Sequence, residues 1–394
     1  MYKTFVVLLA LVVGIYNLQA QQSSIEEILQ TIESNNNELA AFRSYIEGES
    51  WKLKAQNKLP DPQASAFYLP FGVHNSEDYS EFQISQQFEF PTVYAARGNW
   101  IDKKKEGLEQ EYQKLKQDIL LDAEKLILEF IFLQKKYRLV EQRVDQSKEM
   151  YGEVGDLFEK EQVDILDKNK ARIVWLDQQF ALEELETQQM NIVQDIKALN
   201  GGNEINPELS VYPYGIEIPS EDSIWNEYLN QDAQIELLEQ ETQVAQQRLK
   251  VERNQLLPNI TAGYNYQGVA GNNYSGFYGG ISIPLWSGHS KVKVAKAQID
   301  YQEQHKTDVI TSLKSKFSSR VQRYQLLLKK YREYQLAMDE LNGKLLIQKS
   351  YELGEISFSE YFSEVAFYHQ AEDRMLEIEK ELQQLRAELF KYKL

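Results

Sequence analysis

Two long stretches of the chain place apolar residues at alternating steps of three and four. Glu, Lys and Gln fill most of the intervening positions, so each stretch has one apolar and one charged face. This spacing is typical of an amphipathic helix that packs through a coiled-coil-like seam. The first seam consists of Leu115, Ile119, Ala123, Leu126, Phe130, Leu133, Tyr137, Val140 and Val144, and the second of Val309, Leu313, Phe317, Val321, Tyr324, Leu327, Tyr331, Tyr334, Ala337 and Leu341.

The prolines leave both stretches uninterrupted, because residues 92–206 and 285–394 contain none. Glycines near the middle of each block are expected to break the helix before the periodicity resumes. We therefore predict two long helical hairpins, 92–199 and 288–394. A helix of about 55 residues would be roughly 80 Å long, so the expected architecture is elongated. The glycines are Gly152, Gly155, Gly343 and Gly354.

The regions that contain the prolines alternate between apolar and polar residues instead. From Tyr79 to Phe90 the polar positions are every second residue, and similar alternation occurs in 259–267, 277–283 and, more briefly, 64–71. This pattern predicts four β-strands in two hairpins, 62–90 and 258–286. Their length, about 8 to 12 residues, suits tilted membrane-spanning strands.

The two halves of the chain resemble each other. The run Asn57-Lys58-Leu59-Pro60 matches Asn254-Gln255-Leu256-Leu257-Pro258, and Pro91 matches Pro284, at offsets of 197 to 193 residues. The sequence therefore predicts a tandem repeat of strand hairpin plus helical hairpin. The predicted segments are a first repeat at 21–199, a linker at 200–221 and a second repeat at 222–394.

The first residues resemble an export signal. Lys3 precedes an apolar run from Phe5 to Ile15, and Ala20 supplies a small residue for cleavage, so residues 1–20 are predicted to be a signal peptide. A transmembrane anchor is the alternative, although the run is shorter than the roughly 20 residues that a spanning helix needs. No later run approaches 18 apolar residues. An exported protein of this kind would enter a membrane only as a β-barrel.

Four strands cannot close a barrel, and an open sheet edge cannot face lipid. Other copies of the chain must then complete the strands. Three copies would give 12 strands, an even number within the range of outer-membrane barrels.

Composition narrows the classes of function. The 394 residues include 43 Lys and Arg against 60 Asp and Glu, a formal charge of −17, which argues against nucleic acid because phosphate binding needs clustered basic residues. Cysteine is absent, so the sequence offers no disulfide framework, thiolate metal site or catalytic thiol. The four histidines fit no ligand spacing, and the GxSxG, HExxH and GxxxxGK[ST] motifs do not occur, so neither a metal, a cofactor nor an enzyme is predicted. The histidines are His74, His289, His305 and His369.

With this layout the chain resembles the TolC-like outer-membrane efflux proteins. The resemblance covers nearly the whole chain after residue 20. It rests on the duplicated layout and on three segments: Leu256-Leu257-Pro258-Asn259-Ile260-Thr261-Ala262-Gly263-Tyr264, Gly280-Ile281-Ser282-Ile283-Pro284-Leu285 followed by Gly288, and Tyr351-Glu352-Leu353-Gly354-Glu355-Ile356-Ser357. It implies a homotrimer in the outer membrane of a Gram-negative bacterium, with a 12-stranded β-barrel continuous with a long α-helical barrel in the periplasm.

The resemblance also implies partners. Such channels work with a periplasmic adaptor, or membrane fusion protein, and with an inner-membrane pump of the RND type, and they contact outer-membrane lipid but no nucleic acid. The element Leu59-Pro60-Asp61-Pro62, which follows Asn37-Glu38-Leu39, resembles the branch that serves heavy-metal pumps of the copper/silver or cobalt/zinc/cadmium type.

Residues at the two helical turns are implied to form the periplasmic tip. Gly354 matches the tip glycine of the family, and Glu161 stands in its place in the first repeat, a departure that leaves the docking geometry of that turn open. The residues implied to meet the adaptor are Glu161, Val163, Gly354 and Ile356. An acidic ring that would attract cations at the entrance consists of Asp164, Asp167, Glu355 and Glu360, with solvated acidic helix ends as the alternative.

The polar positions of the second predicted strand are expected to face the lumen of the barrel, with the phenylalanines toward lipid. A soluble sheet with one wet face is the alternative. These positions are Glu81, Gln83, Ser85, Gln87 and Glu89. Aromatic residues expected in the interfacial girdles, or else between subunits, are Tyr68, Tyr264, Tyr266, Tyr274 and Trp286.

These features together predict a passive exit duct of a tripartite efflux system. Opening would require the helices at the tip to move apart. The duct of a type I secretion system remains an alternative, as does a soluble periplasmic coiled-coil scaffold.

Overall fold

The computed structural model describes residues 25–69, 78–205, 207, 209–269, 271–286, 288–341 and 343–394. The predicted signal peptide, residues 1–20, and His74 lie outside these ranges. The chain forms two compact units. The sheet unit comprises Ala41–Lys114 and Asp232–Leu313, and the hairpin unit comprises the residues up to Ala40, Leu115–Gln231 and Lys314–Leu394.

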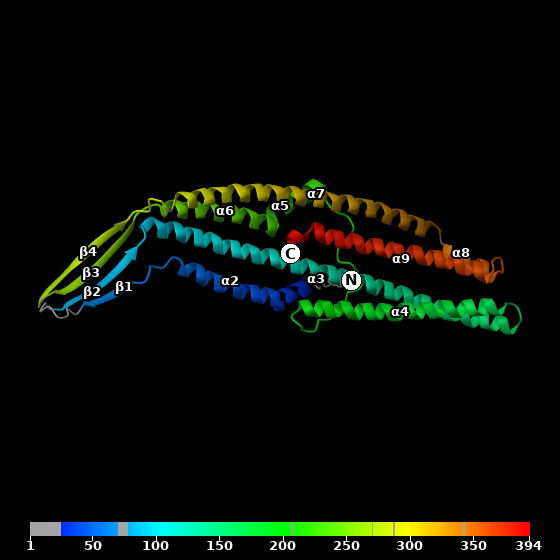
Figure 1. Ribbon diagram of the computed structural model, residues 1–394. Coiled ribbons are helices and arrows are strands. Elements are labelled where there is room, and N and C mark those ends of the chain that lie inside the picture. Colours follow the sequence, from blue (N-terminus) through cyan, green and yellow to red (C-terminus); the bar gives the residue numbers. More distant parts are fainter. Residues whose placement is uncertain are drawn as a thin grey trace, which may run out of the picture. The chain divides into compact units, whose positions relative to one another are not determined.

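A four-stranded antiparallel sheet dominates one end of the sheet unit (Figure 1). Its strands pair in the order β1-β2-β3-β4, so the hairpins of the two repeats lie side by side and join through β2 and β3. The predicted fold class, mainly helical with four strands per chain, is confirmed. The strands are β1 (Gln63–Leu69), β2 (Tyr79–Phe88), β3 (Asn259–Val269) and β4 (Asn272–Ser282).

Four helices adjoin the strands and follow the same order. They are α2 (Asn37–Ala55), α3 (Pro91–Glu159), α6 (Ala233–Asn254) and α7 (His289–Leu341). An apolar cluster that includes Leu53 and Ile101 joins α2 to α3, the Gln240 side chain donates to the Lys103 carbonyl between α6 and α3, and Lys306 pairs with Glu239 between α7 and α6. Within this unit α2 and α7 are therefore the flanking helices.

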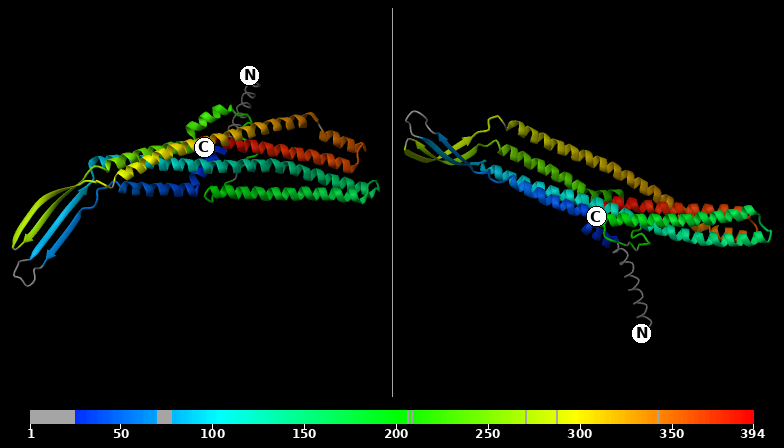
Figure 2. Two further views of the ribbon diagram at one scale, coloured as in Figure 1. Left: turned by 45° about the horizontal axis from the view of Figure 1, so that its top comes forward. Right: turned by 60° about the horizontal axis from the view of Figure 1, so that its bottom comes forward.

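Long helices also make up the hairpin unit, where they lie along one another (Figure 2). Besides the continuations of α3 and α7, and a helix over residues 25–35, the unit contains α4 (Ile165–Leu199), α5 (Glu221–Gln231), α8 (Gly343–Glu352), α9 (Phe358–Leu389) and the 3-10 helix η1 (Lys391–Lys393). No helix within the described ranges is both long enough and apolar enough to cross a membrane.

The two predicted apolar seams differ in how well a single chain covers them. Every residue of the first seam is buried or half-buried in α3, where Phe132 and Leu133 pack against Leu185 of α4. In α7 the seam is buried from Phe317 to Leu327, but Tyr334 and Ala337 are exposed. One copy of the chain therefore leaves Tyr334 and Ala337 of this seam without cover.

The turn of the first hairpin lies further along the chain than the glycines predicted. Helix α3 continues through Gly152 and Gly155 and ends at Glu159. A glycine inside a long helix costs only about 1 kcal/mol relative to alanine, and tertiary packing compensates for it. The turn is formed instead by Glu161, whose left-handed conformation ends α3, and by Asp164, which caps the start of α4.

Within the hairpin unit, a cluster of asparagine side chains links the end of α4 to the end of the helix over residues 25–35. Asn36 Nδ2 donates to the Leu199 carbonyl at 2.9 Å, and Asn35 Nδ2 donates to Asn200 Oδ1 at 3.0 Å. Asn36 and Asn200 are both buried. Gly201 follows with a φ of 66°, and a Cβ added there would lie 2.3 Å from the Asn35 carbonyl oxygen.

We expect Gly201→Ala to destabilise the protein more than Gly202→Ala. Both glycines have positive φ, which costs a side chain about 1 kcal/mol, but a Cβ added at Gly202 would meet no other atom within 4 Å. Only Gly201→Ala would displace Asn35 and break the hydrogen bonds of this asparagine cluster. The loss in the free energy of unfolding should therefore rise to about 3 kcal/mol. Thermal unfolding of the two variants side by side checks this, and equal losses would contradict it.

Candidate functional site

The sheet has one polar and one apolar face. Register places Phe82 opposite Tyr266 and Ile84 opposite Tyr264, which in turn lies opposite Phe277, so these side chains share a face. The face is open, with Phe277 90% exposed. Four of the predicted lumen residues occupy the other face, namely Glu81, Gln83, Ser85 and Gln87.

The polar face is cross-linked by hydrogen bonds between strands. Asn265 of β3 donates to Glu81 Oε1 of β2 at 2.6 Å, and within β2 the Tyr79 hydroxyl donates to Glu81 Oε2 at 2.7 Å. Gln83 donates to the Tyr278 hydroxyl of β4. Amide and carboxylate groups thus line one side of the sheet and hold its strands in register.

Two residues named from the sequence are placed differently from the rest of their sets. Tyr274 pairs with Gln267 and so lies on the polar face, opposite to Tyr264 and Tyr266. Glu89 lies just beyond β2, which ends at Phe88. Period-two alternation continued through Glu89 in the sequence, but the strand itself does not.

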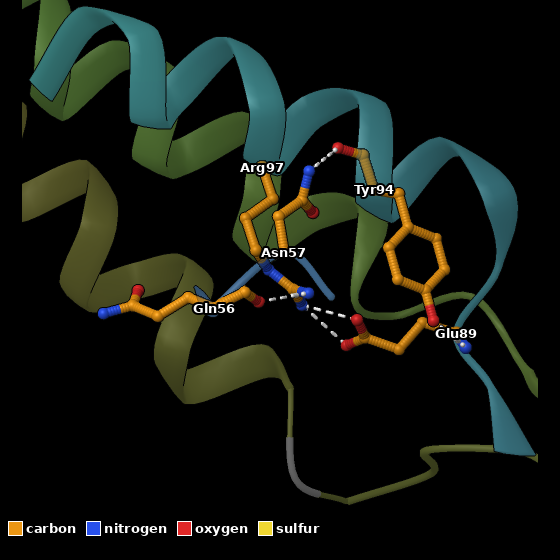
Figure 3. A network of polar contacts seen from close by, with 5 residues as sticks. All are labelled: Gln56, Asn57, Glu89, Tyr94 and Arg97. Carbon is orange, nitrogen blue, oxygen red and sulfur yellow. Dashed lines mark hydrogen bonds and ion pairs between the residues drawn. The ribbon is translucent and has the colours of Figure 1, made fainter. Parts of the chain in front are cut away.

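Glu89 belongs to a polar network at the base of the sheet, shown in Figure 3. The Arg97 guanidinium lies 2.6 and 2.7 Å from the two Glu89 carboxylate oxygens and donates to the Gln56 carbonyl at 3.1 Å. Asn57 donates to the Tyr94 carbonyl, and the Glu89 amide donates to the Tyr94 hydroxyl. The ends of α2 and β2 are thereby fixed to the first turns of α3.

The two helical turns of the hairpin unit have the same backbone geometry. The amide of Gly354 donates to the Tyr351 carbonyl and the next amide to the Ser350 carbonyl, and Glu161 and its successor repeat this pattern on Phe158 and Leu157. These are Schellman motifs, which require a left-handed residue. Gly354 has a φ of 71° and Glu161 a φ of 57°, so the glutamate takes the conformation of the glycine despite the steric cost.

Two of the predicted acidic residues, Asp164 and Glu360, cap the helices that follow these turns. The Asp164 side chain accepts from the Asp167 amide and caps α4, and Asp167 lies 3.8 Å from Lys170. Ser357 and Glu360 form a reciprocal capping box at the start of α9. The Ser357 amide and hydroxyl donate to the carboxylate and thereby lower the pKa of Glu360.

A groove of about 670 Å³ lies between the two turns. Five of the predicted tip residues line it: Val163, Asp164, Asp167, Gly354 and Ile356. Glu161, Glu355 and Glu360 are not part of its lining. Under the groove a small core of Val154, Ala171 and Phe358 holds the hairpins together, and Val163 packs against it.

Arg143 joins the two hairpins further from the turns. Its side chain is only 5% exposed and contacts Glu372 at 3.1 Å and Asp373 at 2.9 Å, and it donates to the His369 carbonyl. Removing one partner of a buried ion pair leaves an uncompensated charge, which typically costs several kcal/mol. Sequence reasoning missed Arg143 and Arg97 because their partners are not marked by any local pattern. The capping box could have been found from its Ser-x-x-Glu spacing.

The paired helical hairpins, the duplicated strand hairpins and the two-faced sheet define a known class of fold. No protein-family model and no curated protein matches the chain. Solved structures do: a membrane protein from Pseudomonas aeruginosa aligns with a TM-score of 0.78 at 13% identity, covering 94% of this chain and 93% of that one. CusC, studied for transmembrane channel formation, aligns with a TM-score of 0.75 at 11% identity over 94% and 92% of the two chains. The Campylobacter jejuni CmeC outer membrane channel gives 0.72 at 14% identity over 94% and 85%.

The chain therefore has the fold of the TolC-like outer-membrane channels, and the resemblance predicted from the sequence is confirmed at the level of the fold. Identities of this size carry no information about substrate. The heavy-metal branch stays a prediction.

Glu161→Gly is expected to stabilise the first turn. Glycine removes the strain of the left-handed conformation, worth about 1 kcal/mol, so local amide hydrogen exchange at the end of α3 should slow about fivefold. Gly354→Ala is the matched reverse change and should accelerate exchange at the end of α8. Equal exchange in Glu161→Gly and the wild type would show that Glu161 makes a compensating contact.

Protection of the first turn of α9 should depend on pH through Glu360. Because its folded pKa is lowered, the carboxylate stabilises the helix start above the ordinary Glu pKa, and this is lost as the pH falls through the lowered folded value. Ser357→Ala should give several-fold faster exchange of this turn at neutral pH and remove most of the pH dependence. Hydrogen exchange between about pH 3 and 7 measures both effects. An unchanged acid response in the variant would contradict the capping box as its cause.

Proposed function

We propose that this protein is the outer-membrane channel of a tripartite efflux system and acts as a passive exit duct. The observation that carries the proposal is the sheet, with one exposed apolar face, one polar face and an unpaired edge at each of β1 and β4 among the described strands. Three copies, joined β1 to β4, would close a 12-stranded barrel with the apolar face toward lipid and the polar face toward a wet lumen.

The hairpin turns would then form the periplasmic end of the duct. A periplasmic adaptor would dock on the turns at Glu161, Val163, Gly354 and Ile356, and an RND-type inner-membrane pump would supply the energy. The shared turn geometry supports equal docking on both repeats. Movement of the two helical hairpins away from each other would open the entrance. The ion pairs of Arg143 with Glu372 and Asp373 would limit this movement.

The acidic entrance favours cationic cargo. Three copies of Asp164, Asp167, Glu355 and Glu360 would give a negative mouth that attracts cations. Two of these carboxylates, Asp164 and Glu360, also cap the helices that follow the turns. Heavy-metal cations are the cargo that the Leu59-Pro60-Asp61-Pro62 element favours.

The proposal is tested by the cell fraction and oligomeric mass of the mature protein. We expect it in the outer membrane, and in detergent size-exclusion with light scattering we expect a protein mass about three times that of the chain. Purified trimers should conduct ions in planar bilayers with a preference for cations. A water-soluble monomer or dimer would contradict the channel and favour a periplasmic coiled-coil scaffold, and co-purification with an ATP-driven exporter would favour a secretion duct.

Matched charge substitutions on the two faces of the sheet sharpen the test. Phe277→Lys would place an ammonium group in lipid at a cost of about 2–4 kcal/mol per copy, whereas Ser85→Lys would project into the wet lumen. Only the first should abolish assembly in the membrane. Equal tolerance of both variants would place the sheet in water.

A further inference from the structure

The two flanking helices of the sheet unit are basic where they adjoin the sheet. Residues 48–62, at the end of α2, and 285–300, at the start of α7, together contain six lysines against the three acidic residues Glu49, Asp61 and Asp300. This balance is opposite to that of the chain as a whole, which carries −17. The lysines are Lys52, Lys54, Lys58, Lys291, Lys293 and Lys296.

Helix stability does not account for this charge. Lysine near the end of α2 suits the negative end of a helix dipole, but Lys291 and Lys293 lie in the first turns of α7, at its positive end. The first turn of α7 contains no acidic residue. These lysines therefore weaken the helix start, and an anionic partner would offset that cost.

The lysines are exposed and are accompanied by exposed apolar side chains. Trp51, Lys54 and Lys58 follow at steps of three and four, and the Lys54 ammonium lies 4.6 Å from the centre of the Trp51 ring system. On the other flank Trp286 is 89% exposed and the neighbouring Leu285 is also exposed. Tryptophan beside lysine is the composition typical of a membrane–water interface.

Within the described ranges, most of these ammonium groups have no ionic partner. Lys52 pairs with Glu49 at 2.9 Å. By contrast, Lys58, Lys291, Lys293 and Lys296 make no ion pair with any residue of the described ranges. The positive charges of these lysines are therefore free to bind an anionic partner outside the chain.

A second copy of the chain is poorly suited to be that partner. Strands and helices share one order, so joining β1 of one copy to β4 of the next would bring the end of α2 beside the start of α7. Lysines would then face lysines at each of the three seams, and like charges at short range repel. An anion between the two lysine clusters would relieve this repulsion.

We propose that each seam binds anionic phospholipid at the periplasmic surface of the outer membrane, with phosphate groups between the two lysine clusters and Trp51 and Trp286 in the interfacial layer. Each lysine near an anionic membrane surface contributes about 1 kcal/mol. The inference rests on the proposed function, since it requires the sheet to be in the membrane. It makes the lipid a structural component of the trimer.

The experiment compares the thermal unfolding of detergent-purified protein with added phosphatidylglycerol, with phosphatidylcholine and with inorganic phosphate. A ligand that binds only the folded state stabilises it, so phosphatidylglycerol should raise the midpoint by several degrees more than phosphatidylcholine. High salt should reduce the difference because the charges are exposed. Free phosphate should have little effect.

Charge variants identify the site. A quadruple variant with Lys54→Gln, Lys58→Gln, Lys291→Gln and Lys293→Gln should form trimers whose midpoint no longer distinguishes the two lipids. The control changes four exposed lysines of the hairpin unit, Lys160, Lys329, Lys330 and Lys349, to Gln and should keep the wild-type preference.

Each other outcome overturns the inference. Equal stabilisation of the wild type by both lipids would exclude an anionic headgroup site, and an equal effect of inorganic phosphate would identify a small-anion site instead. Loss of trimers in the quadruple variant in every lipid would make the lysines direct contacts between copies, and loss of the preference in the control would make it a general charge effect. A wild type that is not a detergent-dependent trimer would refute the proposed function itself.

Discussion

Unpaired backbone groups at the two edges of the sheet are the constraint on which the rest of the structure depends. Within the described chain β1 and β4 each pair on one side only, and buried or lipid-exposed N–H and C=O groups without partners are costly. Helix α7 has a similar deficiency, because Tyr334 and Ala337 of its apolar seam are exposed. Within the described residues, a single chain thus leaves both edges of its sheet unpaired and part of a helix seam uncovered.

Backbone geometry determines the two helical turns more strongly than charge does. Glu161 and Gly354 differ in every side-chain property, yet both adopt the left-handed conformation that the Schellman turn requires. Acidic residues that suggested an electrostatic ring also cap the helices that follow. Asp164 and Glu360 therefore serve the fold and any cation-attracting role at once, so removing either charge would change the turn as well as the local potential.

Buried and half-buried polar contacts connect the secondary-structure elements. Arg97 holds Glu89 and the Gln56 carbonyl, just after α2, at the base of the sheet, and Arg143 holds α9 against α3. Such ion pairs add little net stability compared with apolar packing, but they are costly to break, so they select one alignment of the elements. They explain how long helices with continuous apolar seams avoid sliding past one another.

The sequence by itself determined the long helices, the strands and their faces, the internal repeat and the resemblance to the channel fold, because these follow from local periodicity, proline placement and spacing. The interior glycines predicted the break of the first hairpin too early, at Gly152 and Gly155, whereas the resemblance pointed to the turn at Glu161 that the structure contains. Only the tertiary structure decided the partners of Glu89 and Arg143 and the lining of the groove between the two helical turns. These depend on contacts and register between residues far apart in the chain, which no local pattern encodes.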